Sequence, residues 1–133
     1  MAIVKTVLKK VRQQAVVKVL GSGSIEITPL DLALADESVD APNVRVNITG
    51  AAWSTSDSAV APIVINRGGV AVMYLHGNDN WSMSQMFGFS DTANNSANIT
   101  VVPPNNCTLY LTLTKEAGYV ISANTFPNQN PVP

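Results

Sequence analysis

Short stretches in which apolar and polar residues alternate recur along this chain, with polar or glycine-containing segments between them. The clearest stretch is residues 44–49, which read VRVNIT. Successive side chains of a strand face opposite sides of a sheet, so this segment predicts a strand with one apolar face and one face in water. Comparable patterns predict further strands at residues 63–65, 81–89, 99–102 and 109–113.

Two segments predict hairpins. Residues 15–28 place β-branched runs on either side of Gly21–Ser24, and glycine reaches the positive φ that a tight reversal needs. His76–Asn80 supplies turn residues between the apolar run at 70–75 and the alternation that follows it. The run at 70–75 is typical of a strand covered on both faces, so we expect it to be the central strand.

The two ends of the chain are expected to extend as arms. The apolar positions of residues 4–15 also fit one face of a basic amphipathic helix, but we favour an extended segment. The tail FPNQNPVP has three prolines and no charge, so it cannot join a ladder as an ordinary strand. The expected organisation is an arm or first strand at 1–14, a β-sandwich domain at 15–123 and an extended tail at 124–133.

The strand count and spacing predict the fold class. About eight short strands, with polar turns every 8 to 12 residues, indicate an all-β protein built as an antiparallel β-sandwich. Its connections would be jelly-roll or immunoglobulin-like, and the pattern leaves the strand order open. With 133 residues, of which 46% are hydrophobic, the chain can bury a core without disulfide bonds.

Composition narrows the possible partners. Only 13% of residues are charged, about half the usual share, so much of the surface must be neutral or covered by other protein chains. A net charge of -1 gives no attraction for nucleic acid, and no apolar run approaches the roughly 20 residues that cross a bilayer. The single Cys107 cannot form an internal disulfide, which fits synthesis in a reducing cytoplasm. We expect an assembly protein that binds neither nucleic acid nor membrane.

The charges are unevenly distributed. Five of the eight basic residues occur by position 18, and five of the nine acidic residues fall between positions 26 and 40. A basic arm could meet the acidic loop of a neighbouring copy, because complementary charge guides register; the alternative is two solvated surfaces. The candidate arm contacts are Lys5, Lys9, Lys10, Arg12, Phe126, Pro127 and Pro131, and the candidate acidic contacts are Asp36, Glu37 and Asp40.

The sequence offers few residues that could form a catalytic site or a metal site. A metal site needs three or four ligands, and His76 has only Asp79 near it in sequence. A calcium ion held by residues 78–80 is the alternative. His76 is also the only base that titrates near neutral pH, no GxSxG segment accompanies it, and Cys107 is interpreted as an inert thiol. We therefore expect no cofactor and no enzyme activity.

Two roles with carbohydrates are considered, hydrolysis and binding. Asp79 and Asp91 are separated by an expected strand that would carry them to opposite ends of the sheet, which argues against a glycosidase. Sugar binding stays open, because Trp53 and Trp81 could stack on sugar faces. The alternative is that both tryptophans belong to the core.

Four runs of sequence support a family resemblance. They are KTVLKKVRQQAVVKVLGSGSIEITPLDLAL, APNVRVNITGAAWS, YLHGNDNWSMSQMFGFSD and CTLYLTLTKEAGYV. In order and character they resemble small β-rich structural proteins of tailed bacteriophage virions, especially those of marine and cyanobacterial phages. The resemblance implies a virion location, contacts with the major capsid protein and self-association as a homo-oligomer.

The expected function is therefore that of a capsid decoration or cement protein. The alternatives are a neck, tail or baseplate component, or a carbohydrate-binding surface module. An arm that crosses a neighbouring subunit would add sheet-edge hydrogen bonds. We expect deletion of residues 2–12 to leave the sandwich folded and to abolish incorporation into particles.

Overall fold

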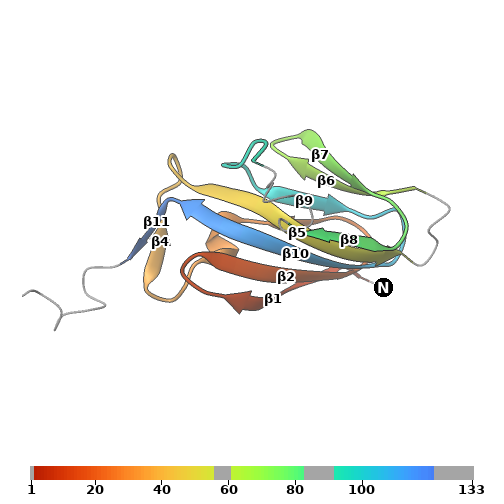
Figure 1. Cartoon of the computed structure of the whole chain (residues 1–133), viewed down its shortest axis with the longest axis horizontal. Coiled ribbons are helices and arrows are strands. Elements are labelled where there is room, and N and C mark those ends of the chain that lie inside the picture. Colours follow the sequence, from red (N-terminus) through yellow and green to blue (C-terminus); the bar gives the residue numbers. More distant parts are fainter. Residues whose placement is uncertain (1, 56–60, 83–91, 122–133) are drawn as a thin grey trace, which may run out of the picture.

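Two antiparallel sheets face each other in the computed structural model, which describes residues 2–55, 61–82 and 92–121 (Figure 1). In spatial order, the larger sheet contains β1 (Val4–Lys10), β2 (Gln14–Gly21), β10 (Cys107–Ala117), β5 (Arg45–Thr55) and β8 (Asp79–Ser82). The smaller sheet contains β3 (Ile25–Ile27), β9 (Ile99–Val102), β6 (Ile63–Arg67) and β7 (Val70–Leu75). The expected all-β, sandwich-like fold is confirmed.

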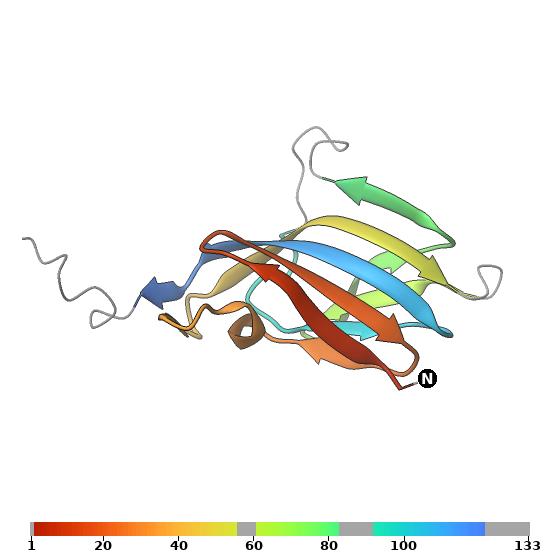
Figure 2. The same cartoon turned by 90° about the horizontal axis from the view of Figure 1, so that it is seen from below.

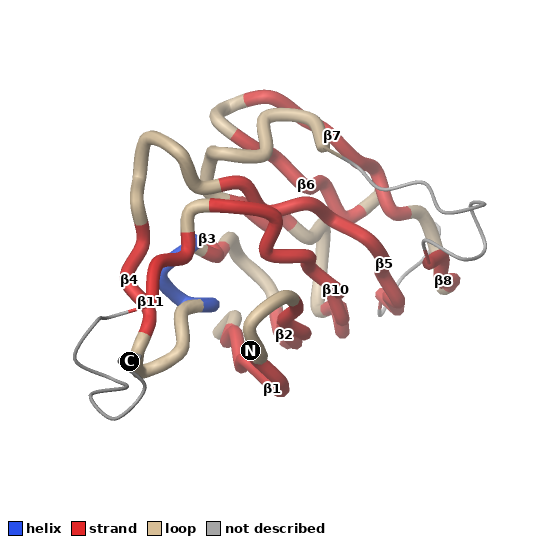
Figure 3. Tube along the Cα trace, turned by 60° about the vertical axis from the view of Figure 1, so that its left-hand side comes forward, coloured by secondary structure: helices blue, strands red, loops and turns tan. Residues whose placement is uncertain are grey.

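A third, two-stranded sheet lies at one end of the sandwich. It pairs β4 (Glu37–Val39) with β11 (Tyr119–Ile121), and the 3₁₀ helix η1 (Pro29–Leu32) lies beside it (Figure 3). The side chain of Thr28 accepts a hydrogen bond from the Asp31 backbone, and that of Asp31 accepts one from the Thr28 backbone, which fixes the start of η1. No helix in the described ranges is long and apolar enough to cross a membrane.

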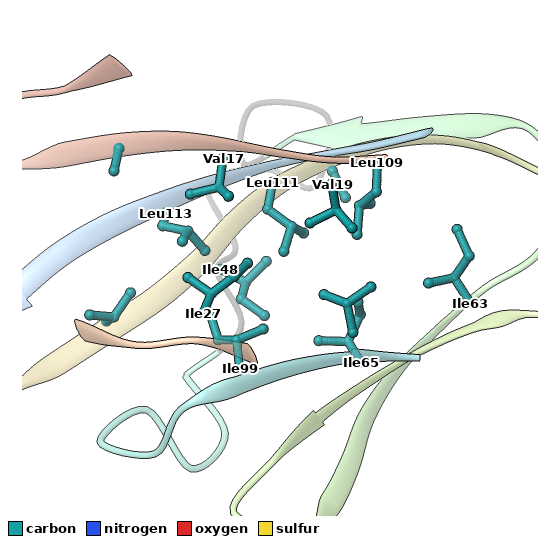
Figure 4. Close-up of a cluster of buried hydrophobic side chains, with 14 of the residues drawn as sticks. Val17, Val19, Ile27, Ile48, Ile63, Ile65, Ile99, Leu109, Leu111 and Leu113 are labelled. Atoms are coloured by element: carbon teal, nitrogen blue, oxygen red, sulfur yellow. The ribbon is translucent and has the colours of Figure 1, made fainter. Parts of the chain in front are cut away.

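The core lies between the two large sheets (Figure 4). Strand β10 runs through the middle of the larger sheet, and its alternate residues Leu109, Leu111 and Leu113 are fully buried. Ile65 and Ile99 face them from the smaller sheet. Because each fully buried aliphatic side chain contributes roughly 1.5–3 kcal/mol, this layer is the main stabilising element of the fold.

The two predicted hairpins are wrong in the same way. β2 and β3 belong to different sheets, and so do β7 and β8, so each predicted turn carries the chain from one sheet to the other. Of the strand expected at 81–89, residues 81 and 82 belong to β8, and residues 83–89 lie outside the described residues. Turn residues allow the chain to reverse, but they do not specify which sheet the next strand joins. The connection Ser22–Ser24 has three residues, and a chain of three residues can reach about 10 Å, which is the spacing of stacked sheets.

Among the described strands, the apolar run at 70–75 lies at the edge of its sheet and is not the central strand that we expected. β7 pairs with β6 on one side, and β10 occupies the centre of the larger sheet instead. An apolar run indicates that both faces of a strand are covered. The position of the strand in its sheet depends instead on whether other strands pair with its two edges. The two properties are independent, so the pattern could not decide between them.

The polar face predicted for residues 44–49 is also largely buried. Asn47 and Thr49 are 7% and 6% exposed. The amide of Asn95 donates a hydrogen bond to Asn47 at 2.9 Å, and the Thr49 hydroxyl donates to the carbonyl of Thr112 at 3.2 Å. The buried polar groups are therefore satisfied by the loop and by the neighbouring strand.

The N-terminal segment forms the first strand of the larger sheet. β1 pairs with β2 along most of its length, and Figure 2 shows β1 in red beside β2 at the outside of the five strands. Ile3 and Val7 pack against the core. Deletion of residues 2–12 would therefore remove an edge strand, so the truncation would not leave the sandwich intact as the sequence suggested.

Candidate interaction surface

An ionic cluster joins the β1–β2 turn, β4 and the end of β10; we call Arg12, Asp36, Glu37 and Lys115 the end cluster. The Nζ of Lys115 lies 2.6 Å from Oε1 of Glu37 and donates a second hydrogen bond, of 2.9 Å, to the carbonyl of Val11. Arg12 binds both carboxylate oxygens of Asp36 and lies 3.6 Å from Glu37. The cluster ties three separate parts of the chain together.

Burial and pairing act in opposite directions on Glu37. Burial disfavours its charged form and by itself would raise the pKa, but hydrogen bonds from the Leu34 N–H and from Lys115 favour the carboxylate. The pKa of Glu37 is therefore lowered. For Asp36, the hydrogen bond from Arg12 is the main cause of a lowered pKa. These groups are held in their charged forms at neutral pH.

Tyr119 packs onto the same end of the sandwich. Its hydroxyl donates a 2.6 Å hydrogen bond to the carbonyl of Pro29, and the Nζ of Lys115 lies 4.5 Å from the ring centroid. Burial raises the pKa of Tyr119, and the charge of Glu37 raises it further. The charges of the end cluster are paired and the Tyr119 hydroxyl is hydrogen-bonded. This end of the molecule therefore has a structural role: it holds the two-stranded sheet and η1 against β10.

Part of the charge complementarity expected between copies is found within one chain. Lys5 on β1 lies 2.6 Å from Asp31, and Arg12 contacts the acidic segment through Asp36. Of the other candidate contacts, Lys9 reaches Gln14 at 3.5 Å, Lys10 is exposed, and Asp40 accepts a hydrogen bond from Asn43 at 2.8 Å. Phe126, Pro127 and Pro131 lie outside the described residues.

The two tryptophans pack against the core. Both Trp53 and Trp81 are partly buried, and the Nε1 of Trp53 donates a 2.9 Å hydrogen bond to the carbonyl of His76. Their placement favours the core role over sugar stacking. Tyr74, in contrast, is 59% exposed on β7.

The described side chains that were considered for metal binding or catalysis do not form a site. Within the part of the chain that the structure describes, no three His, Cys, Asp or Glu side chains form a group that could hold a metal ion. His76 and Asp79 are both exposed, and Asp91 lies outside the described residues. Cys107 is buried, and burial raises the pKa of its thiol, so the thiolate is disfavoured.

The outer face of the larger sheet carries two shallow hollows that meet at Ser54 and Thr108. One, of about 200 Å³, is also lined by Ala52, Trp53, Asp79, Asn80 and Tyr110. The other, of about 250 Å³, is also lined by Leu20, Gly21, Thr55, Asn106 and Cys107. Tyr110 lies opposite Lys18 on β2 and opposite Ala52 on β5, so these side chains form a row across the outer face. This face is mainly neutral and hydroxyl-rich.

Large exposed apolar side chains mark the remaining surface. They are Val4, Leu8, Val11, Leu30, Val70, Tyr74, Val102, Tyr110, Val120 and Ile121. Most lie on or beside β1, β7 and β11, at the margins of sheets, and not in an enclosed pocket. These side chains were not among the contact candidates predicted from the sequence. Alternation alone places Tyr110 on the outer face once its neighbours Leu109 and Leu111 are in the core. For β7, no feature of the sequence distinguished a strand at the edge of a sheet from one at its centre.

The margin at β7 is apolar and uncharged, whereas the margin at β1 combines exposed apolar side chains with the exposed Lys9 and Lys10. A scan against protein-family models, a search of curated proteins and a search of solved structures each found no match to this chain.

Proposed function

We propose that this chain is a structural protein of a tailed bacteriophage virion, a capsid decoration or cement protein that contacts the major capsid protein and its own copies. The observation that carries the proposal is the position of the exposed apolar side chains at the margins of sheets. A sheet margin suits contacts with other folded chains, because backbone hydrogen bonds and apolar side chains can be covered together. The family resemblance of the four sequence runs supports the virion location.

The proposal also accounts for the low share of charged residues. The core layer and the end cluster stabilise the fold by themselves. The low charge content favours contacts with other chains, because two neutral surfaces can meet without removing charges from water. Many weak contacts of this kind add up when copies are repeated on a lattice.

The structure changes which part of the N-terminal segment is expected to bind. The segment does not extend away from the domain, so its contacts would come from side chains that β1 leaves exposed. Val4 and Leu8 are 53% and 52% exposed. We expect these two side chains to contact the capsid.

Add-back to particles tests this function. Purified protein is mixed with particles that lack it, and bound copies are counted by quantitative mass spectrometry. We expect saturable binding at a copy number comparable with that of the capsid subunit, and a loss of at least tenfold in affinity for the Val4→Glu/Leu8→Glu variant. Leu30→Glu is the matched control, because Leu30 is 68% exposed but lies on η1. Failure of the wild-type protein to bind particles would contradict the proposal, and binding in only a few copies would favour a neck, tail or baseplate position.

A second candidate, carbohydrate binding, is favoured by one observation. The hollow of about 200 Å³ places the ring of Tyr110, 38% exposed, beside Ser54, Thr108 and Asn80. An aromatic ring with hydroxyl and amide groups suits a neutral sugar. A glycan array with wild type and Tyr110→Ala discriminates: binding that the variant loses while it remains folded favours this candidate. Trp81→Ala is a poor probe, because that ring packs against the core.

A further inference from the structure

The smaller sheet ends in a strand that carries no charge. β7 pairs with β6 on one side, and among the described residues no strand pairs with its other side. Its sequence is VAVMYL, and Val70 and Tyr74 are 53% and 59% exposed. The backbone N–H and C=O groups on the outer side of an edge strand must bond to water or to another strand.

The other edges of the two large sheets differ from β7. β1 carries Lys5, Lys9 and Lys10, and its pairing with β2 has an irregularity between Val7 and Lys9. β8 is four residues long and contains Asp79, and β3 is three residues long and contains Glu26. Charge, short length and irregular register all discourage the addition of another strand. Of these four edges, only β7 has six residues without a charge.

The absence of charge on β7 favours a second copy of the same strand over a charged partner strand. Two copies of β7 bring no like charges together, whereas two copies of β1 would bring their lysines together. A charged partner strand would find no opposite charge on β7. A two-fold axis through the middle of the strand pairs it antiparallel with itself, and a register centred on Val72 sets Val70 of each copy opposite Tyr74 of the other. Apolar and aromatic pairs placed directly opposite each other stabilise an antiparallel contact.

We propose that β7 is a self-pairing edge, through which two copies of this chain join their smaller sheets into one continuous sheet. A single pair of six-residue strands buries less than the roughly 1,200 Å² typical of stable complexes, so the contact is weak in dilute solution. It becomes effective where many copies are held close together. In that respect the inference rests on the proposed assembly function, for which it names one contact.

Disulfide trapping locates the contact. Single cysteines are placed at residues 71, 72, 73 and 74, and the native Cys107 stays in all variants because it is buried. Opposed residues of an antiparallel pair have Cα atoms about 4.5–5.5 Å apart, which a disulfide can bridge. We expect one or two neighbouring positions to form dimers rapidly under mild oxidation. Thr6→Cys, exposed on β1, is the matched control, and dimers formed equally fast by the control would overturn the proposal.

Charge insertion gives an independent measurement. We expect Tyr74→Lys to weaken self-association at least tenfold in sedimentation equilibrium, because it sets a lysine of each copy at the pairing edge. Leu30, 68% exposed against 59% for Tyr74, lies on a different element, so Leu30→Lys should leave self-association unchanged. Circular dichroism checks that both variants are folded. Wild-type protein that stays monomeric at millimolar concentration, or unchanged association of Tyr74→Lys, overturns the self-pairing edge.

Particle binding separates this inference from the proposed function. If Tyr74→Lys variants bind particles in full copy number and the cysteine scan shows no dimers, the β7 contact is wrong and the decoration role stands. If dimers form but the wild-type protein binds no particle, the decoration role is wrong and the contact stands.

Discussion

The ammonium group of Lys115 and the carboxylate of Glu37 lie 2.6 Å apart, and their side chains are 0% and 2% exposed. Lys115 comes from β10 and Glu37 from β4, so a single ion pair connects the central strand of the larger sheet with the two-stranded sheet. Breaking a buried pair leaves one charge without compensation. We expect Glu37→Gln to lower the free energy of unfolding by ~3 kcal/mol.

The coupling between the two residues distinguishes this effect from lost packing. Lys115→Met and the double variant Lys115→Met/Glu37→Gln complete a double-mutant cycle in urea denaturation. The double variant should be destabilised by clearly less than the sum of the two single changes, because no buried charge is left alone. Additive losses would show that the pair does not act as a unit.

The pH dependence of stability follows from the lowered carboxylate pKa values. Glu37 and Asp31 have pKa values below their ordinary 4.5 and 3.8, so the folded state binds fewer protons than the unfolded state in acid. The stabilisation is complete above the unfolded pKa values and is lost as pH falls through the folded ones. We expect a constant free energy of unfolding from pH 7 to about 5.5 and a decline below about 4.5. Glu37→Gln should start lower and decline less steeply, and parallel curves for the two proteins would contradict this assignment.

Gly118 is required where β10 turns into β11. Its φ is +86°, and a Cβ built there would lie 2.3 Å from the Cα of Val44. Gly69 is the matched control, with a φ of +81° and no atom within 4 Å of the same Cβ. Gly69→Ala should cost about 1 kcal/mol from backbone strain alone, whereas Gly118→Ala must also move the backbone at Val44. Thermal unfolding should give a much lower melting temperature for Gly118→Ala, and equal melting temperatures would show that this close approach is relieved without cost.

Cys107 should be unreactive in the native protein. It is 3% exposed, and burial raises the pKa of its thiol. A thiol reagent at pH 8 should label it only after denaturant is added, whereas Thr6→Cys should add one rapidly labelled thiol. Fast labelling of the wild-type protein would mean that the edge of the core near Cys107 opens readily.

The fold class followed from the sequence because alternation reports directly which side chains face the core. Leu109, Leu111 and Leu113 were expected in a strand and form its buried face. Strand pairing did not follow, because glycine turns such as Gly21–Ser24 serve a hairpin and a crossing between sheets equally well. The end cluster joins positions 12, 36, 37 and 115, which are brought together only by that pairing.

The ion pairs within one chain were not predicted, for the same reason. The unequal distribution of charge left two interpretations, a contact between copies and two solvated surfaces, and a contact within one chain was not among them. The structure contains Lys5–Asp31 and Arg12–Asp36 as contacts within one chain. The exposed edge at β7 depends on strand order, which the pattern left open.

We propose that this chain is a building block whose sheet margins are covered by other protein chains. Under this proposal a tailed phage carries the gene, and quantitative mass spectrometry of its purified virions, with the supernatant measured in parallel, is the most direct test. We expect the chain to sediment with the virions at a copy number comparable with that of the major capsid protein. Recovery of the chain only in the supernatant would contradict it.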